Sequence, residues 1–152
     1  MDLAFEHGLK VFLHFAPGDL DQEAQVEAAA FFDGVGTIRD VVQNHLLQLL
    51  AILAMEPPVS DDAGSLRDEV VKLMRSVRPL EPDAVVRGQY RGYRDHDGVA
   101  PGSDTDTFAA VRFEIDSWRW AGVPFLVRAG KAMAATVSVA RLRCREDAFR
   151  KS

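Results

Sequence analysis

The stretch that decides the fold is RDVVQNHLLQLLAILAMEPP, residues 39–58. Its apolar residues recur at the three- and four-residue spacing of a helix with one buried side, and two consecutive prolines end it. Its first turns nevertheless carry four polar side chains, namely Asp40, Gln43, Asn44 and His45. The sequence therefore predicts a core helix that begins with an unusual group of polar residues.

The buried side of this helix is expected to hold six apolar residues: Ile38, Val41, Val42, Leu46, Leu49 and Leu53. His45 follows Val41 by four positions and Ile38 by seven, so we expect its imidazole to point toward the core or a cleft beside it. A neutral imidazole can accept a proton from a hydroxyl group near neutral pH. This pattern alone leaves two interpretations open, a structural core histidine, which is the commoner case, or a general base.

Two further residues could contact a ligand. Asp40 lies on a polar flank of the helix, and on an ideal α-helix it would stand about 140° away from His45. Lys131 follows a glycine at the end of a predicted strand, from which a basic side chain could reach a bound anion or a sugar hydroxyl. A solvated flank and an ordinary surface lysine explain the same two patterns.

Helix signals flank the central helix on both sides. DQEAQVEAAAFF, residues 21–32, has helix-forming composition, and DGVG, residues 33–36, is expected to break the chain before the central helix. SLRDEVVKLMRSV, residues 65–77, opens with Ser65 and Asp68 at capping-box spacing. The first half of the chain is therefore predicted to be mainly helical.

β-rich segments dominate the second half, after one early strand at residues 9–15. They are AVVRGQYRGY (84–93), TFAAVRFEI (107–115), PFLVRAG (124–130) and TVSVARLRCR (136–145). Helices followed by strands without βαβ alternation predict an α+β fold, with helices packed on one face of a largely antiparallel sheet. The acidic loop at residues 94–106 is expected to be solvated.

Composition limits the class of protein. With 152 residues, 47% of them hydrophobic, the chain can bury one sizeable core, so we expect a single domain over residues 1–152. The net charge of -5 argues against nucleic acid and membrane as partners. The single Cys144 cannot form an internal disulfide, which fits a cytoplasmic protein. The sequence contains neither a G-x-G-x-x-G dinucleotide motif nor a P-loop.

Three long stretches together resemble one known family. They are IRDVVQNHLLQLLAILAMEPP (38–58), LRDEVVKLMRSVRPLEPDAVVRGQYRGY (66–93) and PGSDTDTFAAVRFEIDSWRWAGVPFLVRAGKAM (101–133). In this order they resemble the C-terminal domain of glucose-6-phosphate dehydrogenase. The match runs almost continuously over residues 31–131, whereas residues 1–30 and 137–152 diverge.

The resemblance implies an enzyme that oxidises glucose 6-phosphate at C1 to the lactone and passes the hydride to NADP, in the pentose phosphate pathway. It implies that His45 is the general base, and that Asp40 and Lys131 contact the sugar phosphate. The family's substrate-binding glutamate, counted back without gaps, falls at Asp21.

The family's Rossmann domain and its DHYLGK-type motif have no match in these 152 residues, so we expect the isolated chain to be inactive. An unpaired sheet edge also predicts a homo-oligomer that associates through the sheet. The alternative is a noncatalytic module that binds sugar phosphate or pairs with a full-length relative.

Overall fold

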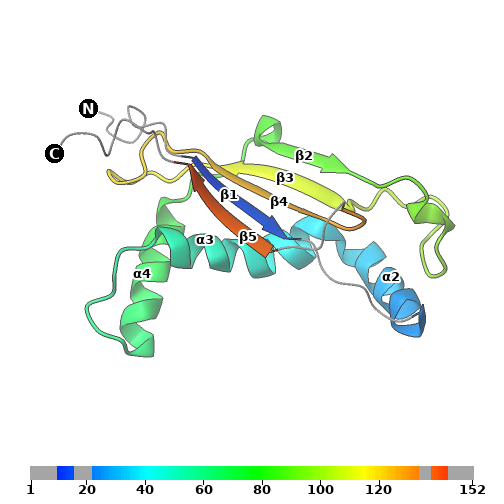
Figure 1. Ribbon diagram of the computed structural model, residues 1–152, viewed down its shortest axis with the longest axis horizontal. Coiled ribbons are helices and arrows are strands. Elements are labelled where there is room, and N and C mark those ends of the chain that lie inside the picture. Colours follow the sequence, from blue (N-terminus) through cyan, green and yellow to red (C-terminus); the bar gives the residue numbers. More distant parts are fainter. Residues whose placement is uncertain (1–9, 16–21, 134–137, 144–152) are drawn as a thin grey trace.

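The computed structural model describes residues 10–15, 22–133 and 138–143 of the chain. The sequence-predicted positions Asp21 and Cys144 lie outside these ranges. The described residues form a layer of helices beneath a twisted sheet of five strands (Figure 1). The helical elements of this layer are α2 (Gln22–Thr37), the π-helical segment η1 (Ile38–Leu46), α3 (Leu47–Ala54) and α4 (Ala63–Ser76).

The sheet has the strand order β2-β3-β4-β1-β5. Its strands are β1 (Lys10–Phe15), β2 (Val85–Gly88), β3 (Phe108–Phe113), β4 (Phe125–Gly130) and β5 (Ser138–Arg143). Neighbouring strands pair antiparallel except β1 and β4, which are parallel, with Leu13 opposite Val127. Two short 3-10 helices lie near β2 in the chain: η2 (Pro82–Ala84) directly precedes β2, and η3 (Tyr93–Asp95) lies between β2 and β3. The predicted α+β class with a largely antiparallel sheet is confirmed.

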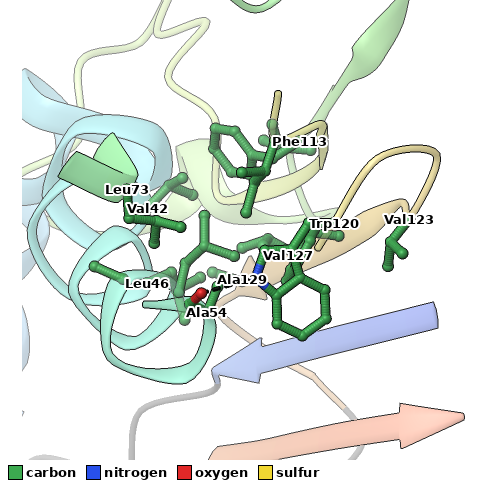
Figure 2. Close-up of a cluster of buried hydrophobic side chains, with 14 of the residues drawn as sticks. Val42, Leu46, Ala54, Leu73, Phe113, Trp120, Val123, Val127 and Ala129 are labelled. Atoms are coloured by element: carbon green, nitrogen blue, oxygen red, sulfur yellow. Dashed lines mark hydrogen bonds between the residues drawn. The ribbon is translucent and has the colours of Figure 1, made fainter. Parts of the chain in front are cut away.

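The core lies between the sheet and the η1–α3 helix (Figure 2). Alternate residues of β3 and β4 face the helix, as the two-residue period of a strand requires. The buried cluster includes Val42, Leu46, Leu50, Ala54, Val111, Phe113, Phe125 and Val127. At one end the indole nitrogen of Trp120 donates a hydrogen bond of 2.7 Å to the carbonyl oxygen of Ala54. This bond satisfies one of the carbonyl groups that a helix leaves unpaired at its C-terminus.

The buried side of the central helix differs from the predicted one after Leu46. Leu49 and Leu53 are each 43% exposed, while Leu50 and Ala54 are buried. The cause is the π-helical segment Ile38–Leu46, where bonds from residue i+5 to residue i add a residue to each turn and shift the register. His45 is also exposed, so of the two orientations predicted for its imidazole, toward the core or into a cleft beside it, the first was wrong.

Two predicted helix boundaries were wrong as well. Helix α2 continues through residues 33–35, and only Gly36, with φ 74°, leaves helical geometry and kinks the chain. Helix α4 begins before Ser65, because Asp62 is its N-cap and accepts bonds from the amides of Gly64 and Ser65. An aspartate is a strong N-cap, so no capping box starting at Ser65 is needed.

The polar loop at residues 94–106 is less solvated than predicted. Ser103 and Asp106 are each only 8% exposed, and both make hydrogen bonds to the helical layer. Within the described ranges, the helices are all too short or too polar to cross a bilayer.

Candidate functional site

Two of the predicted site residues, Asp40 and His45, lie in the same π-helical segment. The amide of Leu47 bonds to the carbonyl of Val42, which shows the i+5 to i pattern of this segment. In such a turn residues five apart approach the same side, whereas an α-helix separates them. Asp40 and His45 are five apart and both lie inside η1. The π-helical geometry therefore reduces the angular separation that an ideal α-helix would impose.

Lys131 reaches the same region from the sheet. It follows β4, and its ammonium nitrogen lies 4.1 Å from the centre of the buried Phe32 ring, in cation–π geometry. Partial burial lowers the pKa of the Lys131 ammonium, and the negative charge of Asp40 acts in the opposite direction. The structure therefore brings Lys131 within electrostatic range of Asp40, although the two residues come from different layers.

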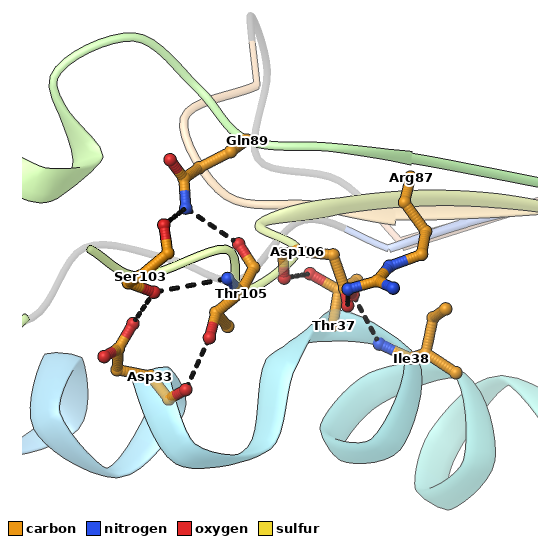
Figure 3. Close-up of polar contacts among 8 residues, drawn as sticks. All are labelled: Asp33, Thr37, Ile38, Arg87, Gln89, Ser103, Thr105 and Asp106. Carbon is orange, nitrogen blue, oxygen red and sulfur yellow. Dashed lines mark hydrogen bonds and ion pairs between the residues drawn. The ribbon is translucent and has the colours of Figure 1, made fainter. Parts of the chain in front are cut away.

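Two consecutive buried residues, Asp106 and Thr107, join the layers at this point, and Figure 3 shows the contacts of Asp106. The carbonyl oxygen of Asp106 accepts bonds from the amide and hydroxyl of Thr37 at 2.9 Å and 2.8 Å. Its carboxylate accepts a bond of 3.0 Å from the amide of Ile38, the first residue of η1. The next carbonyl, that of Thr107, accepts a bond of 2.8 Å from the amide of Lys131.

A second network anchors the end of α2. The carboxylate of Asp33 accepts bonds from the hydroxyls of Ser103 and Tyr93 and from the amide of Ala100. These donors, with the Ser103 hydroxyl first, hold the pKa of Asp33 below its ordinary value although partial burial opposes the shift. Because Asp33 adjoins Phe32, this network also fixes the ring on which Lys131 lies.

A separate hollow of about 350 Å³ lies at the opposite end of β3. Its walls carry Arg78, Arg112, Glu114 and Asp116. Arg78 pairs with Glu114 at 2.8 Å and with Asp116 at 2.6 Å, and Arg112 pairs with Glu114 at 2.7 Å. These charges compensate one another, so the hollow offers no net charge to a ligand.

Comparison with known proteins identifies the family to which this chain belongs. Residues 20–151 match the family model described as the C-terminal domain of glucose-6-phosphate dehydrogenase. The chain belongs to the glucose-6-phosphate dehydrogenase family. It is 56% identical over 112 residues to glucose-6-phosphate 1-dehydrogenase 1 of Mycobacterium tuberculosis. It is 47% identical over 123 residues to cytoplasmic glucose-6-phosphate 1-dehydrogenase 6 of Arabidopsis thaliana.

Solved structures agree with this assignment to the glucose-6-phosphate dehydrogenase family. The enzyme from Mycobacterium avium matches with a TM-score of 0.82 and 45% identity, over 92% of this chain and 30% of that one. A glucose-6-phosphate dehydrogenase in complex with glucose 6-phosphate matches with a TM-score of 0.81 and 38% identity, over 94% of this chain and 31% of that one. The chain covers 74% of its own length in the M. tuberculosis match but only 24% of that relative. It therefore spans about a quarter of the length of its curated relatives.

NADP, the coenzyme expected from the family resemblance, does not fit the described residues. A dinucleotide site of the usual kind needs a strand, a glycine-rich turn and a helix N-terminus facing the diphosphate. The described segments contain no such unit: β1 and β4 are the only parallel pair among them, and no helix follows β4 within the described residues. Nor do they hold a cluster of three or more His, Cys, Asp or Glu side chains suited to a metal ion.

Sequence reasoning missed three residues that shape this site, namely Phe32, Asp106 and Thr107. Phe32 resembled an ordinary core residue, and Asp106 was one acid among several in a polar loop. Gly36 was the available signal, since a glycine just before a helix often permits a backbone turn toward a partner.

Proposed function

We propose that this chain forms the sugar-phosphate side of a glucose-6-phosphate dehydrogenase, which oxidises C1 of glucose 6-phosphate to the lactone with hydride transfer to NADP. The observation that carries the proposal is that Lys131 lies within electrostatic range of Asp40, which shares the π-helical turn with the exposed His45. The family membership and the relative solved with glucose 6-phosphate support the choice of substrate.

Each residue has a chemical role in this proposal. The imidazole of His45 accepts the proton of the C1 hydroxyl as the hydride leaves, acting as general base. The carboxylate of Asp40 accepts hydrogen bonds from sugar hydroxyls, and the ammonium of Lys131 donates to an oxygen of the substrate. Asp21 stays a prediction for a second sugar-binding carboxylate, because it lies outside the described residues.

NADP supplies the hydride acceptor in the proposed reaction. Since the described residues do not fit a dinucleotide, they can orient the sugar and take its proton but cannot align a nicotinamide with C1. We therefore propose that the 152-residue chain, alone, binds glucose 6-phosphate without turning it over. Appearance of NADPH absorbance at a robust rate would contradict this part of the proposal.

Calorimetry with the 152-residue chain tests the sugar site. Glucose 6-phosphate should release heat on binding at millimolar concentration, and no heat from the wild-type chain would contradict the proposal. Lys131→Met should weaken binding roughly 10- to 100-fold, because a hydrogen bond to a charged group contributes about 1.5 to 3 kcal/mol. Lys72→Met is the matched control, because Lys72 is exposed on α4 and pairs with Glu69 instead.

Two further variants separate the roles of the helix residues. Asp40→Asn should weaken binding, since the amide keeps one acceptor oxygen but loses the charge. His45→Ala should reduce binding less, because a general base contributes chiefly to the transition state. Full affinity in Asp40→Asn would remove Asp40 from the site.

We also propose that the chain self-associates through the sheet face opposite the helices. Val86 of β2 is 60% exposed and Val139 of β5 is 43% exposed, and each lies on a strand at the edge of the sheet. Edge strands and an uncovered face favour pairing with a second copy. Light scattering should give a dimer or larger species, and Val86→Lys should shift it toward monomer. A monomeric wild type would contradict this proposal.

A cytoplasmic location belongs to the same proposal. Its support is the single cysteine of the sequence and the cytoplasmic designation of the Arabidopsis relative. Fluorescence microscopy of the tagged chain is the test, and a signal confined to another compartment would contradict it.

A further inference from the structure

Asp106 occupies the junction between the two layers that carry the proposed site (Figure 3). Its side chain is only 10% exposed and is held from outside by Arg87, at 3.2 Å. From this position the carboxylate binds the amide of Ile38 at 3.0 Å, and the carbonyl binds Thr37 through two bonds. Asp106 therefore anchors the backbone at the start of the π-helical segment.

The neighbouring Thr107 connects the same point to Lys131. Thr107 is fully buried, donates its amide to Gly88 at 2.9 Å, and accepts the Lys131 amide on its carbonyl at 2.8 Å. Asp106 and Thr107 are consecutive, so the covalent chain fixes the spacing between the start of η1 and the backbone of Lys131.

Gly36 allows the hydrogen bonds from Thr37 and Ile38 to Asp106 to form. Its φ of 74° turns the chain so that the next two amides, those of Thr37 and Ile38, face Asp106. A Cβ at Gly36 would lie 3.1 Å from the Asp106 carboxylate. The negative charge of the Asp106 carboxylate is also favourable at the start of η1, because the N-terminal end of a helical segment attracts anions.

We propose that Asp106 is the positioning residue that sets the π-helical turn bearing Asp40 against Lys131 in the sugar-phosphate site, an inference that rests on the function proposed above. Asp106 acts through the backbone and touches no substrate. Without the Asp106 carboxylate, the start of η1 can move relative to Lys131. The Asp40 carboxylate and the Lys131 ammonium are then no longer held at a fixed distance from each other. A displacement of this kind, on the order of 1 Å, is enough to impair a site.

The test is the electrostatic coupling between Asp40 and Lys131, measured in the 152-residue chain without ligand. The chain has four lysines, so the Lys131 signal can be followed by NMR of ¹³C-labelled lysine across pH. In the wild-type background, Asp40→Asn should move the titration of Lys131 to lower pH. In the Asp106→Ala background the same change should produce roughly half that shift or less. An equal shift in both backgrounds would overturn the proposal.

A matched control separates positioning from helix stability. Asp62 caps α4 in the same manner, through the amides of Gly64 and Ser65, but belongs to an exposed helix end. Asp62→Ala should lower stability yet leave the coupling between Asp40 and Lys131 at its full size. Loss of the coupling in Asp62→Ala as well would show a general structural effect and contradict the proposal.

Asp106→Asn covers the case in which the alanine variant does not fold, as judged by circular dichroism. It keeps an oxygen for the Ile38 amide and should retain an intermediate coupling, and wild-type coupling in Asp106→Asn would then refute the proposal. Glucose 6-phosphate should then bind about fivefold more weakly to Asp106→Ala and equally well to Asp62→Ala. If the wild-type chain binds no glucose 6-phosphate, the proposed function fails, while the lysine titration still decides the role of Asp106.

Discussion

The ammonium nitrogen of Lys131 lies 4.1 Å from the centre of the Phe32 ring. Phe32 lies in α2 and Lys131 directly follows β4, so the contact joins the helical layer to the sheet. Phe32 is 2% exposed, and its ring also makes a T-shaped contact with the ring of Tyr93. A buried aromatic face stabilises a cation with little competition from water, so Phe32 helps to keep Lys131 charged.

Replacing Phe32 with leucine should therefore lower the pKa of Lys131 further, because burial remains and the favourable ring is lost. The free energy of unfolding should fall by about 1 to 3 kcal/mol from lost packing and cation–π contact. Lysine NMR and urea denaturation measure the two effects. Phe113→Leu, in the core on β3, is the control and should reduce stability alone. A Lys131 titration that does not change in Phe32→Leu would refute the prediction.

The two tryptophans should respond very differently to the same substitution. Trp120 is buried and its indole bonds to the carbonyl of Ala54, whereas Trp118 is 88% exposed. Trp120→Phe should lower the free energy of unfolding by about 1 to 3 kcal/mol, because the Ala54 carbonyl loses its hydrogen-bond donor at the buried helix end. The free energy of unfolding of Trp118→Phe should stay within about 0.5 kcal/mol of the wild-type value. Urea denaturation monitored by circular dichroism compares them, and equal losses would contradict the structure.

Two neighbouring glycines should give effects of opposite sign when changed to alanine. Gly36 has a φ of 74° and lies against Asp106, so Gly36→Ala should destabilise by about 1 to 2 kcal/mol. Gly34 lies in helical geometry with nothing within 4 Å of an added Cβ, so Gly34→Ala should stabilise by about 0.5 to 1 kcal/mol. Thermal denaturation of both variants is the measurement. A stable Gly36→Ala would mean that the kink is not required.

Acid should weaken the network at the end of α2. The pKa of Asp33 is held below its ordinary value of 3.8, first by the Ser103 hydroxyl. A lowered folded-state pKa contributes stability that is present above 3.8 and is lost as the pH falls through the folded-state value. Asp33→Asn should remove this contribution, and Ser103→Ala should move the loss to higher pH. Unfolding free energies measured at several acidic pH values test this, and identical profiles for all three proteins would contradict it.

Much of the fold could be predicted from local pattern. The strands at residues 108–113 and 125–130 and the helix ending at the two prolines follow directly from alternation, helical spacing and breakers. The start of α4 could not, because Asp62 and Ser65 are both good caps and only the folded backbone selects one.

The candidate site was predictable only in part. Asp40, His45 and Lys131 were candidates from the residue pattern and received roles from the family resemblance, whereas their surroundings were not predicted. The π-helical turn has no simple sequence signature, and it reversed the predicted burial of His45 and Leu49. Asp106 was indistinguishable from its acidic neighbours, since its role depends on the distant amides of Thr37 and Ile38.

The sequence by itself determined which segments become helices and strands, and to which family the chain is similar, because periodicity and ordered motifs are local properties of the chain. Tertiary structure alone decided that Lys131 lies within electrostatic range of Asp40 and that Phe32 and Asp106 support this arrangement. The physical reason is that these contacts join residues far apart in sequence across two layers. Their geometry depends on how the helix packs on the sheet, and no single segment encodes that packing.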